Sequence, residues 1–152
     1  MIRDDRAVKL ICTRDTHVPA IGPNVPAVRW LGPADYPFAL EAWRCRGVLL
    51  TRRDWDVLWP ADGYAFAGVV SDGRLESVAA ALSWNPPSPA SWELAGVWTH
   101  EEARNQGFAT AVCSVVTAHI LDGGRVATCT TTRSRAVMIR VAERLGYQPV
   151  SE

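Results

Sequence analysis

Three β-rich segments follow one another between residues 64 and 99, at 64–70, 75–84 and 92–99. The first two are joined by Asp72-Gly73, a dipeptide that favours the tight turn of an antiparallel hairpin. A proline-rich connection leads from the second segment to the third. We therefore expect three antiparallel strands in series in the middle of the chain.

The last third of the chain alternates between helix and strand. Residues 108–121 are apolar on nearly every side, which is typical of a deeply packed helix, and Gly123 and Gly124 end it. A strand at 126–131 and a helix at 136–145 follow. Strand–helix–strand order implies a crossover and one parallel pair, so the sequence predicts an α/β (α+β) fold with a mixed, mostly antiparallel sheet flanked by helices.

The first third is less regular. Within residues 1–26, Val8 to Cys12 alternates like a strand, and proline and glycine are frequent after it. We expect a strand at 28–31, then a helix that carries Tyr36, Leu40 and Trp43 on one face. A second, short helix is expected after Thr51, ending near 60–63.

Length, charge and hydropathy argue against nucleic-acid-binding, membrane and secreted proteins. A chain of 152 residues fits one core, and 16 Lys+Arg against 16 Asp+Glu give no net charge, so we expect no nucleic-acid partner. No apolar stretch reaches the roughly 18 residues of a membrane span, and residues 1–6 are charged where a secretory signal is apolar. We expect a cytoplasmic protein without a membrane partner.

The cysteines and histidines do not predict a metal site. Four cysteines lack CxxC spacing and lie in mainly apolar segments, so we expect reduced, buried thiols at Cys12, Cys45, Cys113 and Cys129. The segment 100–104, His-Glu-Glu-Ala-Arg, lacks the second histidine of a zinc-binding HExxH motif. His119 is expected inside the buried helix.

Residues 104–109, Arg-Asn-Gln-Gly-Phe-Ala, lie where the third strand turns into the buried helix. A glycine and small residues at such a junction leave backbone N–H groups without acceptors and exposed. The positive end of the helix dipole makes these groups more attractive to anions. The loop suits a pyrophosphate. Spacing alone leaves open a tight helix entry without a ligand.

This loop resembles the acyl-CoA loop of the GNAT superfamily of N-acetyltransferases, whose pattern is [Arg/Gln]-x-x-Gly-x-[Gly/Ala]. Arg104, Gly107 and Ala109 occupy its fixed positions, and 140–147 resembles the last helix with its Leu-Gly-[Phe/Tyr] ending. The resemblance extends from Tyr64 to Val150 and more weakly from Val28. We therefore divide the chain into an N-terminal arm, 1–26, and a GNAT domain, 27–152.

The resemblance implies a sheet splayed at a cleft that holds acetyl-CoA as cosubstrate. Strand 94–99 would bind pantetheine through the backbone of Val97 and Thr99, with Trp98 between them. The pyrophosphate would lie on the loop and helix start, formed by Arg104, Asn105, Gln106, Gly107, Phe108, Ala109 and Thr110. An amine would attack the thioester directly, while a backbone N–H near Val97 polarises its carbonyl.

Two positions depart from the family pattern. Arg135 stands where many members have an asparagine, and it either reaches a CoA phosphate or is an exposed helix-start arginine. Ala142 stands where many members have the tyrosine that protonates the leaving thiolate. Some members, including acetylases of protein amino termini and of antibiotics, often lack that tyrosine.

Glu93 is the candidate catalytic base. On an alternating strand it shares a face with Ala95, Val97 and Thr99, so it can look into the cleft and accept a proton through water. A solvated strand-end carboxylate is the alternative, and His100 is a second candidate for proton transfer. Four tryptophans come from elements that border the acceptor site in the family: Trp43, Trp55, Trp59 and Trp84. We expect most tryptophans to lie in the core, and the alternative is that some line an apolar acceptor pocket.

The sequence thus predicts an N-acyltransferase that moves an acetyl group from acetyl-CoA to an amine of a small molecule, protein or peptide. A non-catalytic GNAT-fold sensor or scaffold that binds CoA is the alternative. A bare interaction protein fits less well with an intact Arg-x-x-Gly-x-Ala loop. Because only five residues follow Tyr147, we also expect the arm 1–26 to pair with a sheet edge, within its own chain or in a homodimer.

Overall fold

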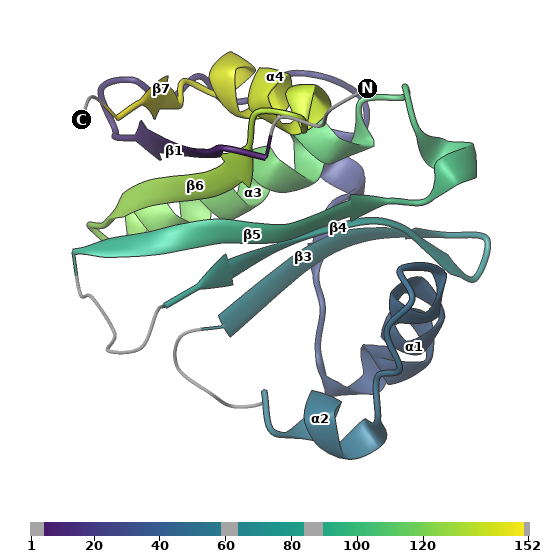
Figure 1. The fold of residues 1–152 in the computed structure, drawn as a ribbon. Coiled ribbons are helices and arrows are strands. Elements are labelled where there is room, and N and C mark those ends of the chain that lie inside the picture. Colours follow the sequence, from purple (N-terminus) through teal and green to yellow (C-terminus); the bar gives the residue numbers. More distant parts are fainter. Residues whose placement is uncertain (1–4, 59–63, 84–89, 151–152) are drawn as a thin grey trace.

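A computed structural model describes residues 5–58, 64–83 and 90–150 of the chain (Figure 1). Its centre is a seven-stranded sheet with the order β2-β3-β4-β5-β6-β1-β7. The strands are β1 (Ala7–Cys12), β2 (Arg29–Trp30), β3 (Tyr64–Ser71), β4 (Arg74–Leu82), β5 (Ser91–Thr99), β6 (Val126–Thr132) and β7 (Gln148–Pro149). The helices are α1 (Tyr36–Cys45), α2 (Arg52–Asp56), α3 (Phe108–Asp122) and α4 (Ala136–Arg144).

The three central strands form as the sequence predicts. β3 and β4 make an antiparallel hairpin, and both turn residues have positive φ, 54° at Asp72 and 75° at Gly73, as a type I′ turn requires. β4 then pairs antiparallel with β5. The parallel pair is β5 and β6, joined through α3, so the predicted mixed, mostly antiparallel sheet is confirmed.

Helices cover the two faces of the sheet unequally. α3 and α4 pack on one face over a core that includes Leu94, Val112 and Ala127. α1 and α2 pack on the opposite face over β3 and β4, where Trp55 is fully buried. In Figure 1 they lie at the β3 end of the sheet, away from β6 and β1.

The strand in the arm lies inside the sheet. β1 pairs antiparallel with β6 along its whole length and with β7 on its other edge. Leu10 and Cys12 are fully buried, because alternate residues of β1 face the α3–α4 core. The expected pairing of the arm with a sheet edge is confirmed, and it is made within the chain.

After β1 the arm runs closely along α3 and past the end of α4. Val18 N–H donates to Leu145 O at 3.0 Å, and Ala20 N–H donates to Ser114 Oγ at 2.9 Å. At Gly146, with φ of 96°, a Cβ atom would lie 1.9 Å from the backbone oxygen of Thr16. A glycine at this position is therefore required both by its φ and by the passing arm.

Three predictions about single residues or ends need correction. Cys45 is exposed because it lies on the outer side of the last turn of α1, whereas the other three thiols are buried. His119 is exposed, and its ring lies 4.8 Å from that of Trp30. α2 ends at Asp56, while its expected end at 60–63 lies outside the described residues.

Candidate active site

β5 and β6 separate after three residue pairs, and the separation creates an opening in the sheet. The parallel pairing runs from Ser91↔Val126 to Glu93↔Thr128 and, in the described chain, no further. Figure 1 shows the two strands diverging beyond this point. The β5 edge from Leu94 onward therefore presents unpaired backbone N–H and C=O groups to the opening.

A β-bulge at Gly96 changes which way the end of β5 faces. Ala80 pairs with Ala95 and Val78 with Trp98, so Gly96 and Val97 together oppose one residue of β4. Gly96 has φ of 60°, a conformation that favours glycine. The extra residue shifts by one the alternation of β5 side chains between the two faces of the sheet.

The expectation that Glu93 shares a face with Val97 and Thr99 is therefore wrong. Val97 packs towards the α3 core, and Thr99 Oγ1 lies 2.9 Å from Ser77 Oγ. Trp98 packs against the α1–α2 core. Glu93 and Ala95, which precede the bulge, line a groove on the other side of the sheet from α3.

The loop before α3 holds a row of unpaired backbone amides. Ala111 makes the first helical hydrogen bond, to Gly107 O at 3.1 Å, and no group in the described chain accepts a bond from the N–H groups of residues 105–110. Positive φ at Asn105 (63°) and Gly107 (83°) turns the chain sharply into the helix. Six amides at a helix start make a site suited to a phosphate group.

Two sets of contacts hold this loop in place. Arg74 bridges Glu76 on β4, at 3.0 Å, and Glu102 in the loop, at 2.8 Å, and this contact lowers the pKa of Glu102. Arg104 Nε donates to Thr99 O at 3.3 Å, which ties the loop to the end of β5. The loop is thus fixed both to β4 and to the end of β5.

The arm contacts the same loop. The Asn24 amide donates to Gln106 O, and a Cβ at Gly107 would lie 3.4 Å from Asn24 Nδ2. A cavity of about 290 Å³ lies between arm residues 20–25 and the start of α3, with Arg144 on its wall. Sequence reasoning missed this contact, since nothing in the composition of the arm shows where it crosses α3.

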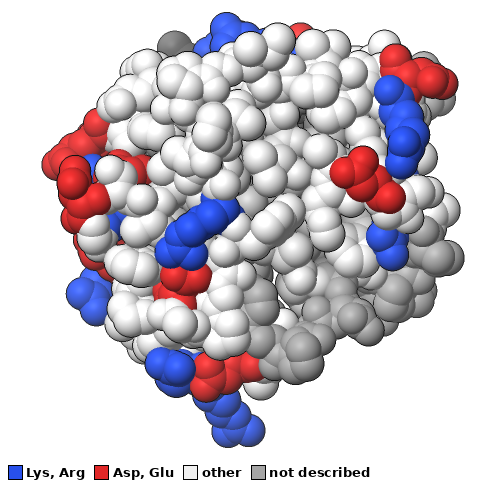
Figure 2. Space-filling model, turned by 180° about the vertical axis from the view of Figure 1, so that it is seen from behind, with Lys and Arg blue, Asp and Glu red and all other residues white. Residues whose placement is uncertain are grey.

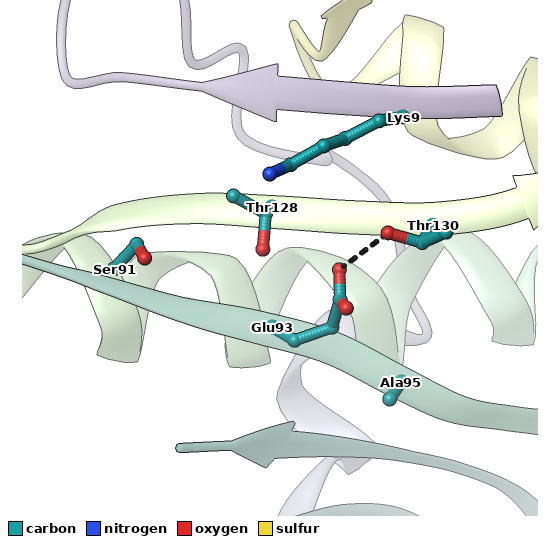
Figure 3. Close-up of a pocket in the computed structure, with 6 residues that line it drawn as sticks. All are labelled: Lys9, Ser91, Glu93, Ala95, Thr128 and Thr130. Atoms are coloured by element: carbon teal, nitrogen blue, oxygen red, sulfur yellow. Dashed lines mark hydrogen bonds between the residues drawn. The ribbon is translucent and has the colours of Figure 1, made fainter. Parts of the chain in front are cut away.

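The groove on the open face of the sheet has a volume of about 570 Å³ (Figure 3). Alternate residues of β1, β5 and β6 point into it. Figure 1 shows that α1 and α2 do not extend over this part of the sheet. Its lining residues are Lys9, Ser91, Glu93, Ala95, Thr128 and Thr130.

Glu93 lies at the point where the groove meets the opening. Its side chain is 5% exposed, and Thr130 Oγ1 donates to its carboxylate at 3.3 Å (Figure 3). Burial raises the pKa of the neighbouring Cys129 thiol to about 11, and the Glu93 carboxylate contributes to the rise. The position fits a general base, and an exposed strand-end carboxylate does not describe it.

One arginine side chain, that of Arg135, lines the opening. Arg135, at the start of α4, lies beside it together with Val97 and Thr130. The pKa of the Arg46 guanidinium, at the end of α1, is lowered by burial and by the positive charge of Arg135. Arg135 therefore adds positive charge beside the opening, which favours anionic ligands.

The other proton-transfer candidates are held elsewhere. His100 Nδ1 accepts a bond from Glu102 N–H at 3.3 Å, and the His100 ring lies 5.7 Å from that of Trp98, away from the groove lining. Ala142 is fully buried in α4. The phenol of Tyr147 is paired with Thr117 Oγ1 at 2.8 Å in the core, where burial raises its pKa.

Two of the four tryptophans singled out above lie in the core. The rings of Trp43 and Trp55 pack against each other at 6.2 Å and against Phe66. Trp59 and Trp84 lie outside the described residues.

Other kinds of site are not found in the described chain. It holds no group of three or more acidic, histidine or cysteine side chains placed to bind a metal ion. None of its helices has the length and apolar character needed to cross a bilayer. On the described part of the face in Figure 2, basic and acidic side chains are interspersed and form no continuous basic patch.

Comparison with known proteins identifies relatives of this fold. The model of the acetyltransferase (GNAT) family matches residues 30–147. No curated protein matches the chain significantly. A protein described as an acetyltransferase from the GNAT family of Novosphingobium aromaticivorans is 28% identical, with a TM-score of 0.75 over 98% of this chain and 62% of its own.

Two further solved structures share the fold at lower identity. A GNAT acetyltransferase from Colwellia psychrerythraea has a TM-score of 0.75 at 12% identity, over 99% of this chain and 55% of its own. An aminoglycoside N-acetyltransferase in complex with CoA has a TM-score of 0.67 at 16% identity, over 82% of this chain and 93% of its own. The chain thus spans only 55% to 62% of the length of the first and second of these three structures.

Proposed function

Since this chain belongs to the acetyltransferase (GNAT) family, we propose that it transfers an acetyl group from acetyl-CoA to the amine of an acceptor by direct attack. The observation that carries this proposal is the row of unpaired amides at 105–110 beside the opening between β5 and β6. The opening can hold an extended chain, and the amides of the loop can bind a pyrophosphate attached to it.

The same proposal assigns the binding of acetyl-CoA to residues beside this opening. The unpaired edge of β5, at Val97, Trp98 and Thr99, would bind the pantetheine amides. The loop and helix start, from Arg104 through Asn105, Gln106, Gly107, Phe108 and Ala109 to Thr110, would hold the pyrophosphate. Arg135 would contact the cosubstrate from the start of α4.

Bound there, acetyl-CoA would supply an activated thioester carbonyl. Glu93 would accept the proton of the acceptor ammonium, directly or through a water, from its place at the edge of the groove. A backbone N–H near Val97, at the bulge, would donate to the developing oxyanion. With Ala142 in α4 and Tyr147 paired to Thr117, the departing thiolate would take its proton from solvent.

Release of free CoA thiol with a panel of primary amines tests the transferase. A second candidate, a CoA-binding sensor without turnover, is favoured by Ala142, which provides no proton donor at its position. Calorimetry with CoA separates the two. Binding with turnover supports the enzyme, binding without turnover on any amine supports the sensor, and absence of binding contradicts both.

A further inference from the structure

We propose that the acceptor is a small amine that also carries an anionic group, a carboxylate or a phosphate ester, and that Lys9 binds that group. This inference rests on the proposed transferase function and narrows its substrate class. It arises from the groove in Figure 3, which a lysine of β1 and a glutamate of β5 line from opposite sides of β6.

The position of Lys9 is fixed by the sheet on both sides. Lys9 pairs with Thr130 of β6, and its carbonyl accepts a hydrogen bond from Val150 N–H at 2.9 Å. Because side chains alternate along a strand, this register puts Lys9 on the groove face, whereas Leu10 faces the core. Figure 3 shows the ammonium reaching over β6 to Thr128.

The ammonium of Lys9 is available to a ligand. Four arginine–carboxylate contacts occur in the described chain, yet none of its carboxylates lies within ion-pair distance of Lys9. Lys9 is also the single lysine of the sequence. A compact ammonium with three donors suits a carboxylate or phosphate oxygen.

The two charges of the groove lie on opposite sides of β6. Glu93 lies on β5 where the opening begins, and its register partner on β6 is Thr128. The Lys9 ammonium reaches Thr128 from β1, on the other side of β6 (Figure 3). An acceptor with its amine at Glu93 would therefore present its other end to Lys9. Hydroxyls of Ser91, Thr128 and Thr130 add further donors and acceptors.

The same charge pattern argues against polycationic acceptors. Among the described residues that line the groove, one positive charge balances one negative charge, and Arg135 adds positive charge beside the opening. An acceptor with several ammonium groups would meet one carboxylate among these residues, and its further positive charges would face Lys9 and Arg135. The class of acceptor named for the aminoglycoside N-acetyltransferase with the same fold is thus not expected here.

The experiment compares amines in matched pairs on the full chain with acetyl-CoA. The pairs are the L-amino acids against their C-terminal amides, and phosphoethanolamine against ethanolamine, with an aminoglycoside as the polycationic member. We expect kcat/KM to be at least tenfold higher for an anionic member than for its neutral partner, mainly through KM. The pair with the larger ratio of kcat/KM between its anionic and neutral members shows whether the anionic group of the acceptor is a carboxylate or a phosphate ester.

Lys9 variants test the residue itself. Lys9→Met should bring the ratio between anionic and neutral partners close to one, and Lys9→Arg should restore most of it, with unchanged thermal unfolding in both variants. A parent protein that prefers neither partner, or a Lys9→Met variant that keeps the preference, would overturn the inference.

Binding separates a failure of this inference from a failure of the proposed function. Calorimetry measures each pair against the protein saturated with CoA. If no amine is acetylated but the anionic partner binds at least tenfold more tightly, and Lys9→Met abolishes the difference, the transferase fails and the assignment of Lys9 stands. Equal binding of both partners contradicts the assignment whether or not turnover occurs.

Discussion

At the scale of single residues, the roles of Glu93 and Lys9 depend on strand register more than on their neighbours in sequence. The sequence was enough to single out Glu93 as the candidate base, because it lies on the strand that precedes the loop at 104–109. Lys9 was conspicuous only as the single lysine, because the partner of β1 had to be known before its side chain could be placed on the groove. A register shift of one residue would turn both side chains to the opposite face.

Glu93→Gln should lower turnover about a hundredfold with little change in CoA affinity. The amide keeps the shape of the side chain and its contact with Thr130 but cannot accept a proton. Steady-state CoA release and calorimetry with CoA check the two parts. Glu143→Gln, an exposed carboxylate on α4, serves as the control and should retain parental turnover. A Glu93→Gln variant as active as the parent contradicts the base assignment.

At the scale of elements, the sequence was sufficient for the central strands, α3, β6 and α4. Their patterns are local: a two-residue turn with positive φ, an apolar helix between glycines, an alternating strand. The bulge at Gly96 was not predicted, because one glycine within a strand does not show by itself whether an extra residue is inserted. That single insertion decides which of 93, 97 and 99 reach the groove.

Gly107→Val should weaken acetyl-CoA binding at least tenfold, or about 1.4 kcal/mol. Its φ of 83° is strained for valine, and the side chain would crowd Asn24 and the amides of the loop. Gly124→Val is the matched control. Gly124 has φ of 77° just beyond the other end of α3, with open space around it, so it carries similar strain far from the loop.

Calorimetry with CoA and urea unfolding distinguish the two glycine variants. Both should lose some stability, but only Gly107→Val should lose CoA affinity beyond what the unfolded fraction explains. Equal affinity in the two variants would remove the loop from the binding site.

At the scale of the whole molecule, the arm is a structural part of the sheet. β1 separates β6 from β7, and residues 14–24 contact α3, α4 and the loop at 104–107. The sequence predicted that the arm would pair with an edge, since few residues follow Tyr147. It could not predict the partner strand, because pairing between residues 7–12 and 127–132 is set by tertiary packing.

Leu10→Ala should therefore destabilise the fold by about 2–5 kcal/mol, as expected for truncating a fully buried leucine. Val18→Ala, at a residue 57% exposed in the same arm, should change the free energy of unfolding by less than about 0.5 kcal/mol. Urea denaturation measures both values. A Leu10→Ala variant as stable as Val18→Ala would show that the arm is dispensable to the core.

Buried thiols should make the protein less stable at alkaline pH. Burial raises the pKa of Cys12, of Cys113 and of Cys129, the last to about 11 from an ordinary value of 9.0. A raised pKa means that the folded chain retains protons that the unfolded chain releases above pH 9. Their stabilising contribution is complete below pH 9 and is lost as the pH rises towards 11.

The free energy of unfolding should consequently fall with pH above 9, by up to about 1.4 kcal/mol per pH unit for each such thiol. Urea unfolding under reducing conditions between pH 8 and 10.5 measures the slope. Cys129→Ala should make it shallower, because one titrating group is removed from the core. Cys45→Ala, which removes the exposed thiol and leaves the three buried thiols in place, is the control variant. Identical slopes in the parent and in Cys129→Ala would show that this thiol ionises no later in the folded chain than in the unfolded one.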